Sequence, residues 1–503
     1  MDVRQGARGS GTGKSATPRR AERRENSAPP DDHVIVVFGA TGDLARRELL
    51  PGLFHLAKAG LLPARYRIIG SGRSTLTDDE FRRRAKEAVT QFGRAEPTGP
   101  AWREFANSLS FASAQPTQPQ PLLDAVAAAE QALGGHPRRL YHLAVSPGGF
   151  QPTIGMLGGT GLASNARVIV EKPFGTDLAS ARALNDTIHA TFDESQVFRI
   201  DHFLGKESVD NILALRFANG LFEPIWNREH ISYVQIDVPE TIGIEGRAGF
   251  FEQTGTFQDM IVTHLFQVLG FVAMEPPTSL AAKPLRDEKT KVFEAMPPLD
   301  PTRVVRGQHR GYRHEPGVDA GSQTETFLAA RVEVDNWRWS GVPFYLRSGK
   351  RLGQKRQVVT LGFNEPPLRM FALDRDAPNA TPSNQLVIDF DDPGWIAAHF
   401  LAKEPGATTR LGEATMTFRY ADSFGTRHAL AGYERLILDA MLGDQSLFTR
   451  ADGIERLWQV SAPLLDDPPP VQPYTPGSWG PDASHRLVSP HHWYLPDTQS
   501  DPP

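Results

Sequence analysis

VIVVFGATGDLARRELLPGLFHLAKAG, residues 34–60, decides the fold of the N-terminal part of the chain. It begins with a continuous β-branched run, residues 34–38, which is typical of a strand buried on both faces of a parallel sheet. Gly39, Gly42 and Ala45 follow at a G-x-x-G-x-x-A spacing, a variant of the dinucleotide-binding fingerprint. Small residues there let backbone N–H groups approach a pyrophosphate. With leucines at helical spacing behind it, the stretch predicts a strand, a phosphate-binding turn and a helix.

The chain continues this pattern beyond the first helix. Residues 66–69 form a second predicted strand, which completes a βαβ unit with a right-handed crossover. Residues 75–135 predict a helix, an irregular Gln/Pro-rich loop and an Ala-rich helix. Further strands are expected at residues 140–145 and 168–170, and a helix at residues 177–194. Alternating strands and helices of this kind indicate a Rossmann-like parallel sheet.

The second part of the chain has a different pattern. From about residue 325, several strand-like segments follow one another without intervening helices, so an antiparallel sheet is the economical interpretation. The predicted fold is therefore α/β plus α+β: an N-terminal Rossmann-like parallel sheet, then a larger domain with a mainly antiparallel sheet and helices. We expect a dinucleotide-binding domain at residues 31–200 and a substrate-binding domain at residues 201–503.

The composition excludes several classes of function. The chain has 503 residues, of which 40% are hydrophobic, and two domains are the natural expectation. A net charge of -5 argues against a nucleic-acid partner, and the absence of cysteine excludes disulfides and thiolate metal sites. No apolar run suits a membrane span and no signal core is present, so we expect a cytoplasmic protein without a membrane partner. Residues 1–30, rich in Gly, Ser, Pro and Arg, are expected to be a disordered tail.

A second stretch, RIDHFLGKE at residues 199–207, concentrates charged side chains. Its apolar lead-in predicts a strand end, where side chains point into the ligand crevice of an open α/β sheet. Asp201 and His202 are adjacent and would face opposite ways on an extended backbone, so we expect them to have different roles. His202 and Lys206 are four apart, and one helical turn would join them into a cationic face suited to a phosphate. The alternative is a solvated, salt-bridged loop.

RIDHFLGKE resembles the signature of the glucose-6-phosphate dehydrogenase family, in which a tyrosine usually stands at the position of Phe203. EKPFG at residues 171–175 and GYERLILDAMLGDQSLFTRADGIERLW at residues 432–458 also resemble that family. The resemblance covers about residues 33–490. It implies oxidation of β-D-glucose 6-phosphate to the lactone with reduction of NADP, the first step of the pentose phosphate pathway. It also implies a homodimer or homotetramer.

The resemblance implies roles for individual residues. His264 resembles the general base that removes the proton from the anomeric hydroxyl, and Asp201 resembles its carboxylate partner. The alternative for His264, in an otherwise apolar helix, is a satisfied core histidine. His202 and Lys206 resemble phosphate anchors. The other expected substrate ligands are Lys172, Glu240, Asp259, Lys350 and Lys355. No metal is implied, since the nicotinamide takes the hydride.

The expected cofactor is NADP in preference to NAD. Arg73 follows the second strand, in a segment where enzymes that choose NAD commonly place an acid. Its guanidinium suits a 2′-phosphate, whereas Glu48, where a lysine is common, would weaken that preference if it faced the cofactor. The expected cofactor ligands are Gly39, Ala40, Thr41, Gly42, Asp43, Leu44, Arg73 and Lys172.

Four residues depart from the family pattern. Phe203 removes one possible phosphate hydrogen bond, and Glu48 replaces a common lysine. Lys355 stands where an arginine is common in some members, and Asp391 stands where a glutamine commonly meets the substrate. Two other functions therefore stay open: a dehydrogenase of another sugar or sugar phosphate, and a non-catalytic nucleotide or sugar-phosphate sensor on the same scaffold.

Overall fold

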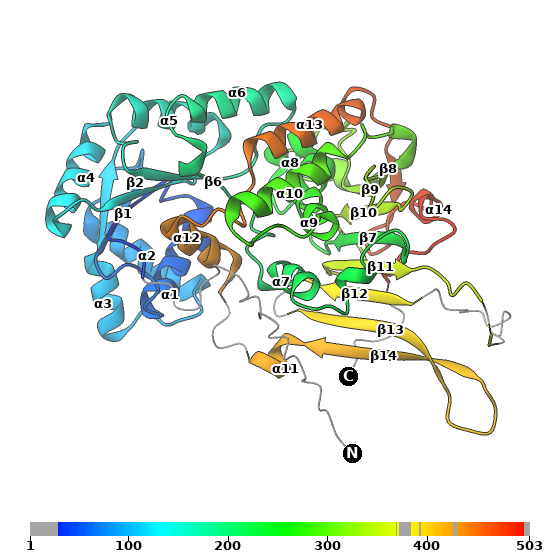
Figure 1. The fold of residues 1–503 in the computed structure, drawn as a ribbon. Coiled ribbons are helices and arrows are strands. Elements are labelled where there is room, and N and C mark those ends of the chain that lie inside the picture. The colour runs from blue at the N-terminus through cyan, green and yellow to red at the C-terminus, as the bar shows by residue number, and fades with distance from the viewer. Residues whose placement is uncertain (1–28, 369, 372–383, 392–393, 426–429, 497–503) are drawn as a thin grey trace, which may run out of the picture.

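Two sheets organise the protein (Figure 1). The structure, a computed structural model, describes residues 29–368, 370–371, 384–391, 394–425 and 430–496. The predicted tail therefore lies almost entirely outside the described residues. Within the described part of the chain, no helix is long and apolar enough to cross a membrane.

The first sheet has six parallel strands in the order β3-β2-β1-β4-β5-β6, as the Rossmann-like prediction requires. Its strands are β1 (His33–Phe38), β2 (Tyr66–Gly72), β3 (Leu109–Ser113), β4 (Arg138–Leu143), β5 (Ala166–Val170) and β6 (Val197–Arg199). Every residue of β1 is buried, because the β-branched run is covered on both faces. Figure 1 shows α5 and α6 on one side of this sheet and α1 and α3 on the other.

Seven helical segments of four or more residues connect these strands. They are the π-helical η1 (Ala45–Leu49) and the α-helices α1 (Leu50–Lys58), α2 (Asp78–Phe92), α3 (Gly99–Asn107), α4 (Gln120–Leu133), α5 (Phe150–Gly159) and α6 (Leu178–His189). The shorter 3₁₀ turns are η2 (Pro147–Gly149) and η3 (Glu194–Gln196). The prediction of an irregular loop before the Ala-rich helix is wrong in part, because α3 and β3 lie there. Only Leu109 and Ala112 of β3 are fully buried, so no alternating apolar pattern marks it.

The second sheet has nine strands in the order β14-β13-β12-β11-β7-β10-β9-β8-β15. They are β7 (Ile231–Pro239), β8 (Val304–His309), β9 (Phe327–Val332), β10 (Phe344–Gly349), β11 (Val358–Phe363), β12 (Gln385–Asp389), β13 (Trp395–Lys403), β14 (Leu411–Arg419) and β15 (Gln472–Tyr474). The predicted antiparallel character is confirmed for most pairs, but β7 with β10 and β8 with β15 run parallel. That exception matters, because parallel neighbours end at the same edge of a sheet.

Helices cover this second sheet, and two of them, α12 and α13, contact the first sheet. They are α7 (Glu207–Phe217), α8 (Ala248–Thr256), the π-helical η5 (Phe257–Leu265), α9 (Phe266–Ala273), α10 (Ala282–Glu294), α11 (Tyr420–Phe424), α12 (Gly432–Leu442), α13 (Ala451–Asp466) and α14 (Ala483–Leu487). The shorter 3₁₀ turns are η4 (Glu223–Ile225), η6 (Pro301–Arg303) and η7 (Tyr312–His314). Arg167 of β5 donates to the carbonyl oxygen of Ala440 at 3.0 Å, and Trp458 of α13 donates to that of Phe174 at 3.0 Å. These contacts fix α12 and α13 against the first sheet.

Candidate active site

Two neighbouring strands of the first sheet deliver charged side chains to one edge. β5 and β6 run parallel with Val170 opposite Arg199, and the backbone N–H of Ile200 donates to the Val170 carbonyl at 3.0 Å. Lys172 and Asp201 therefore emerge together just beyond the carboxyl ends of these strands. In open α/β sheets this edge is where ligands bind.

A π-helix supplies the partner for these strand ends. Asp259 and His264 lie five residues apart in η5, where an ordinary α-helix would point them in different directions. The i→i+5 hydrogen bonds of a π-helix widen the turn, as the bond from Phe266 N to Ile261 O shows. Lys172 Nζ consequently reaches both side chains, donating to Asp259 Oδ1 at 3.0 Å and lying 2.8 Å from His264 Nε2.

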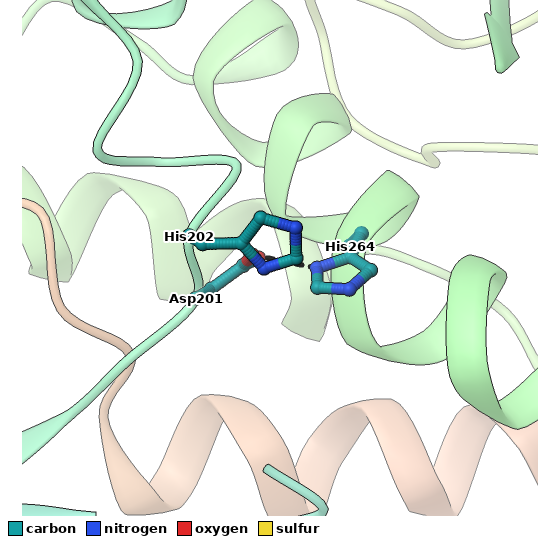
Figure 2. A group of neighbouring side chains, drawn as sticks. All are labelled: Asp201, His202 and His264. Atoms are coloured by element: carbon teal, nitrogen blue, oxygen red, sulfur yellow. Dashed lines mark hydrogen bonds and ion pairs between the residues drawn. The ribbon is translucent and has the colours of Figure 1, made fainter. Parts of the chain in front are cut away.

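Asp201 and His264 form a buried hydrogen-bonded pair (Figure 2). Asp201 Oδ1 lies 2.6 Å from His264 Nδ1, and the two side chains are 0% and 1% exposed. Burial would raise the pKa of Asp201, but the charge and hydrogen bond of His264 hold it below its usual value. The ionised carboxylate accepts the Nδ1–H, which leaves the lone pair of the imidazole on Nε2. This is the geometry of an oriented general base.

His202 lies against the same imidazole. We expected Asp201 and His202 to face opposite ways, but residues 202–205 form turns, and the rings of His202 and His264 are 4.8 Å apart. Polar atoms of Asp201, His202 and His264 lie within 4.8 Å of one another, and the Asp201–His264 hydrogen bond already engages one atom of each partner. Burial, His264 and Lys172 lower the pKa of His202 well below its usual value. His202 is therefore a neutral hydrogen-bonding group at pH 7, not a second cation.

Lys172 and Asp259 set the charge beside the base. Burial would raise the pKa of Asp259, but Lys172 and His264 together lower it to about 2. Asp259 thus stays ionised, and it anchors the ammonium that contacts His264 Nε2. A hydroxyl that took the place of Lys172 Nζ would find the imidazole lone pair ready to accept its proton.

The second sheet adds a charged pair from its own parallel edge. Pro239 of β7 lies opposite Gly349 of β10, so Glu240 and Lys350 follow side by side and form an ion pair. The charge of Lys350 also reaches Asp259, which joins the two edges into one site. Lys355, by contrast, is exposed and makes no ion pair with the described residues, so the structure does not bring it together with the others.

Lys206 lies on another wall of the site. Its Nζ donates to Gln357 Oε1 and, at 3.3 Å, to the Phe390 carbonyl, and it lies 3.6 Å from Asp391 Oδ1. The ring of Phe203, where a tyrosine is usual, stacks on the His264 imidazole with centroids 4.3 Å apart. The departure at Phe203 therefore leaves an apolar wall beside the base.

The glycine turn after β1 has the shape of a phosphate-binding loop. Gly39 has φ +76°, and a Cβ there would lie 2.2 Å from the Ala144 carbonyl oxygen, so only glycine fits. The N–H groups of Gly39 and Ala40 donate to the carbonyl of Ser71 in β2, at 2.9 and 3.2 Å. The N–H of Arg46 donates to the Gly42 carbonyl at 3.1 Å, so the turn leads directly into the helical segment, and a helix start of this kind suits a phosphate. Thr41, Gly42 and Asp43 are exposed at the turn, and Leu44 is half-buried behind it.

Arg73 emerges beside this turn. It is exposed and follows Gly72, at which a Cβ would lie 3.9 Å from Thr41 Oγ1. Glu48 is exposed, and partial desolvation together with the charge of Glu434 in α12 raises its pKa. The residues present therefore fit a nicotinamide dinucleotide whose pyrophosphate lies on the turn.

Sequence reasoning missed four contacts in and around the site. Tyr433 donates to Glu171 Oε2 at 3.2 Å, and its ring is parallel to that of His202 at 6.2 Å between centroids. Glu171 Oε1 in turn lies 2.8 Å from His142 Nε2. Gln357, 151 residues further along the chain, accepts a hydrogen bond from Lys206. These contacts join residues far apart in sequence, and no local pattern could have indicated them.

The fold and the site define a class: an oxidoreductase with an NAD(P)-binding domain and an oriented imidazole base at the carboxyl edge of its parallel sheet. The match to known families is more specific. Residues 36–211 match the family model "Glucose-6-phosphate dehydrogenase, NAD binding domain", and residues 213–494 match "Glucose-6-phosphate dehydrogenase, C-terminal domain". The chain belongs to the glucose-6-phosphate dehydrogenase family.

Curated relatives and solved structures agree. The chain is 41% identical to glucose-6-phosphate 1-dehydrogenase of Rhizobium meliloti over 92% of this chain and 96% of that one. It is 40% identical to the same enzyme of Dickeya dadantii over 90% and 96%. A crystal structure of the Mycobacterium avium enzyme superposes with a TM-score of 0.83 at 39% identity, covering 93% of this chain and 99% of that one. A glucose-6-phosphate dehydrogenase solved in complex with glucose 6-phosphate gives a TM-score of 0.85 at 32% identity, with the same coverage.

Proposed function

We propose that this protein oxidises D-glucose 6-phosphate to 6-phospho-D-glucono-1,5-lactone with hydride transfer to NADP. The observation that carries the proposal is the buried Asp201–His264 pair beside Lys172, in a chain that belongs to the family over nearly all of its length. We assign dinucleotide binding to residues 31–200 and substrate binding to residues 201–503.

The proposed reaction begins with proton removal by His264. In the structure Lys172 Nζ lies beside His264 Nε2, 2.8 Å away. The anomeric hydroxyl takes that position and gives its proton to Nε2, while Asp201 stabilises the imidazolium through Nδ1. NADP, when bound, accepts the hydride from carbon 1. The electrostatic interaction between Asp201 and His264 is stronger than in water because both side chains are buried.

The remaining polar residues orient the sugar. Lys206 is the phosphate anchor, since its ammonium is a cation on the wall away from the base, and neutral His202 adds a hydrogen bond. The other proposed sugar ligands are Lys172, Glu240, Asp259, Lys350 and Lys355. Lys355 would need to turn inward from its exposed position.

Formation of NADPH, followed by its absorbance, tests the proposed function. We expect turnover with glucose 6-phosphate and NADP, and much less with other sugar phosphates or with free glucose. Unmodified glucose as the better substrate would indicate a different sugar dehydrogenase. Binding of glucose 6-phosphate without turnover would indicate a sensor.

The preference for NADP is proposed to depend on Arg73. Its exposed guanidinium beside the glycine turn suits a 2′-phosphate. Arg73→Ala should raise the KM for NADP several-fold and leave the KM for NAD nearly unchanged. Arg67→Ala, which changes an arginine within β2, is the matched control. Equal or better use of NAD by the unmodified protein would contradict the preference.

We propose self-association through the free edge of the second sheet. Among the described residues β14 is the last strand of the sheet, and Met416 and Phe418, which lie on one face of it, are exposed. An apolar sheet edge is a ready surface for pairing with a second copy. Light scattering should give a dimer or tetramer, and Met416→Lys should shift it toward a monomer. A wild-type monomer at micromolar concentration would refute this.

A further inference from the structure

Glu325 is a buried acid that the proposed chemistry does not use. It lies in the segment just before β9. Its Oε1 accepts a hydrogen bond from the backbone N–H of Phe257, the first residue of η5, at 2.9 Å. Its backbone carbonyl accepts from the N–H of Thr256 at 3.1 Å. One residue beside the second sheet therefore holds the start of the π-helix on which Asp259 and His264 lie.

The start of η5 needs this support because the helical path is broken there. Gly255 has φ +57° and ψ −174°, a break between α8 and η5. The side chain of Thr256, the residue before η5, makes no capping hydrogen bond. The first N–H groups of a helix have no partner within it, and a carboxylate is a strong acceptor for them. A Cβ on Gly255 would lie 2.3 Å from Glu325 Oε1, so the glycine leaves room for the carboxylate.

Arg306 of β8 fixes the direction of this carboxylate. Its Nη2 and Nε donate to Glu325 Oε2 at 2.7 and 3.2 Å, which leaves Oε1 for Phe257. The side chains of Arg306 and Glu325 are 13% and 7% exposed. Arg306 also donates to the carbonyl oxygens of Pro469, at 2.9 Å, and Gln323, at 3.0 Å. The carboxylate is therefore held in one orientation from the side of the second sheet.

The next residue along the chain holds the other edge of the site. The carbonyl oxygen of Thr326 accepts from the backbone N–H of Lys350 at 2.7 Å. Residues 325 and 326 thus connect the start of η5 to the strand end that delivers the Glu240–Lys350 ion pair. A shift at this connection would change the position of η5 relative to that strand end.

We propose that Glu325 is a positioning residue: its carboxylate fixes the start of η5 and thereby holds Asp259 and His264 against Lys172. This inference rests on the proposed function, since it takes His264 as the base and Asp259 as a sugar ligand. Phe257 lies two residues before Asp259, so the loss of its hydrogen bond acts first on that carboxylate. A displacement of about 1 Å in a positioned group can lower a rate by about 10²-fold.

Two double variants of the full-length protein separate the hydrogen bond from the ion pair. Arg306→Leu with Glu325→Leu, the leucine pair, removes both. Arg306→Leu with Glu325→Gln, the glutamine pair, keeps an amide oxygen that can accept from the N–H of Phe257. Both avoid an unpaired buried charge, which would threaten folding.

The kinetic expectation is a loss confined to the leucine pair. Its kcat with glucose 6-phosphate should fall by about ten- to hundredfold, and the glutamine pair should stay within about threefold of wild type. The KM for glucose 6-phosphate should rise in the leucine pair as well, because Asp259 is a proposed sugar ligand. A simple loss of folded protein would lower kcat and leave this KM unchanged. Glu325→Asp keeps the charge beside Arg306 but is one methylene too short to reach Phe257, so it should show the same changes.

Hydrogen exchange, read by mass spectrometry, does not require turnover. Exchange in residues 257–265 should be about tenfold faster in the leucine pair than in the glutamine pair, since an uncapped first turn opens more often. Residues 33–38 of β1 are the internal control and should exchange equally in both. If wild-type protein fails to oxidise glucose 6-phosphate but this difference is present, the proposed function fails and the role of Glu325 stands. Equal exchange in residues 257–265, with equal kcat and KM in the two pairs, would overturn the proposal and leave Glu325 only as the counter-charge of Arg306.

Discussion

Two regions of the site each bury an acid: the base region around Asp201 and His264, and the proposed phosphate wall around Lys206, Asp389 and Asp391. The surroundings shift the pKa values of the two buried acids in opposite directions. Asp201, beside the base, is 0% exposed, and Asp389, on the phosphate wall, is 2% exposed. His264 holds the pKa of Asp201 below its usual value, against the effect of burial. Burial and neighbouring Asp391 raise the pKa of Asp389 to about 6, although Arg356 and Lys206 oppose them.

The difference lies in the local balance of charge, because burial is the same. Around Asp201 the neighbouring groups are the imidazoles of His264 and His202, so the carboxylate ionises readily. On the phosphate wall, two acids share Lys206 and Arg356. The first region holds a negative charge beside the proposed base. The second balances two acids against two cations, so its carboxylates would compete with the proposed phosphate for Lys206.

His264→Asn tests the base region and has the largest expected effect. Asparagine keeps some hydrogen bonding but cannot take the proton, so kcat should fall by about 10²–10⁴-fold. Binding of glucose 6-phosphate, measured by calorimetry, should change little. Near-normal turnover would mean that this histidine is only a packed core residue.

Lys206→Ala tests the phosphate wall. Charge-assisted hydrogen bonds are worth roughly 1.5–3 kcal/mol, so the KM for glucose 6-phosphate should rise more than tenfold. The KM for free glucose should change far less, because free glucose carries no phosphate that could contact Lys206. Lys283→Ala, an exposed lysine of α10, serves as the control. Equal damage to both substrates would remove the phosphate assignment.

The sequence predicted the parts of these regions that depend on local pattern. The strand and glycine turn of residues 34–42 could be predicted, because β-branched runs and small residues at fixed spacing have few alternatives. The strand end before Asp201 could be predicted for the same reason. The family resemblance supplied the partnership of Asp201 with His264, which no local rule contains.

The remaining features depend on contacts that sequence cannot show. The π-helix that aligns Asp259 with His264 reads as an ordinary amphipathic helix in the sequence. The parallel pairing of β7 with β10 joins segments about a hundred residues apart, and it places Glu240 beside Lys350. β13 went unpredicted, since Ala397 is its one fully buried residue. In each case tertiary packing decides the structure.

Asp391→Asn sharpens the comparison by removing one of the two acids on the phosphate wall. Asp391 Oδ1 lies 3.6 Å from Lys206 Nζ, so it competes with a phosphate for that ammonium. A partly exposed ion pair is worth about 0.2–1 kcal/mol, so its loss should lower the KM for glucose 6-phosphate by about 1.4- to fivefold. The effect should vanish in a Lys206→Ala background. A higher KM in the single variant would mean that Asp391 contacts the substrate favourably.

Asp389→Asn tests the same pair of acids through stability. Because the folded pKa of Asp389 is raised to about 6, the folded state keeps a proton that the unfolded state releases. This group's contribution to stability is therefore full below its ordinary pKa and is lost as pH rises through about 6. Above that pH the wild-type protein holds a buried carboxylate at a cost of about 1–3 kcal/mol, which a neutral asparagine avoids. The variant should melt a few degrees higher than wild type at pH 7.5 and by a clearly smaller margin at pH 4.5. Asparagine can still accept the backbone N–H of Asp391, which lies 3.0 Å from Asp389 Oδ1. It loses the ion pair with Arg356 Nη1 at 3.2 Å. A lower melting temperature at pH 7.5 would mean that this ion pair outweighs the repulsion from Asp391, and the phosphate wall would then resemble the base region after all.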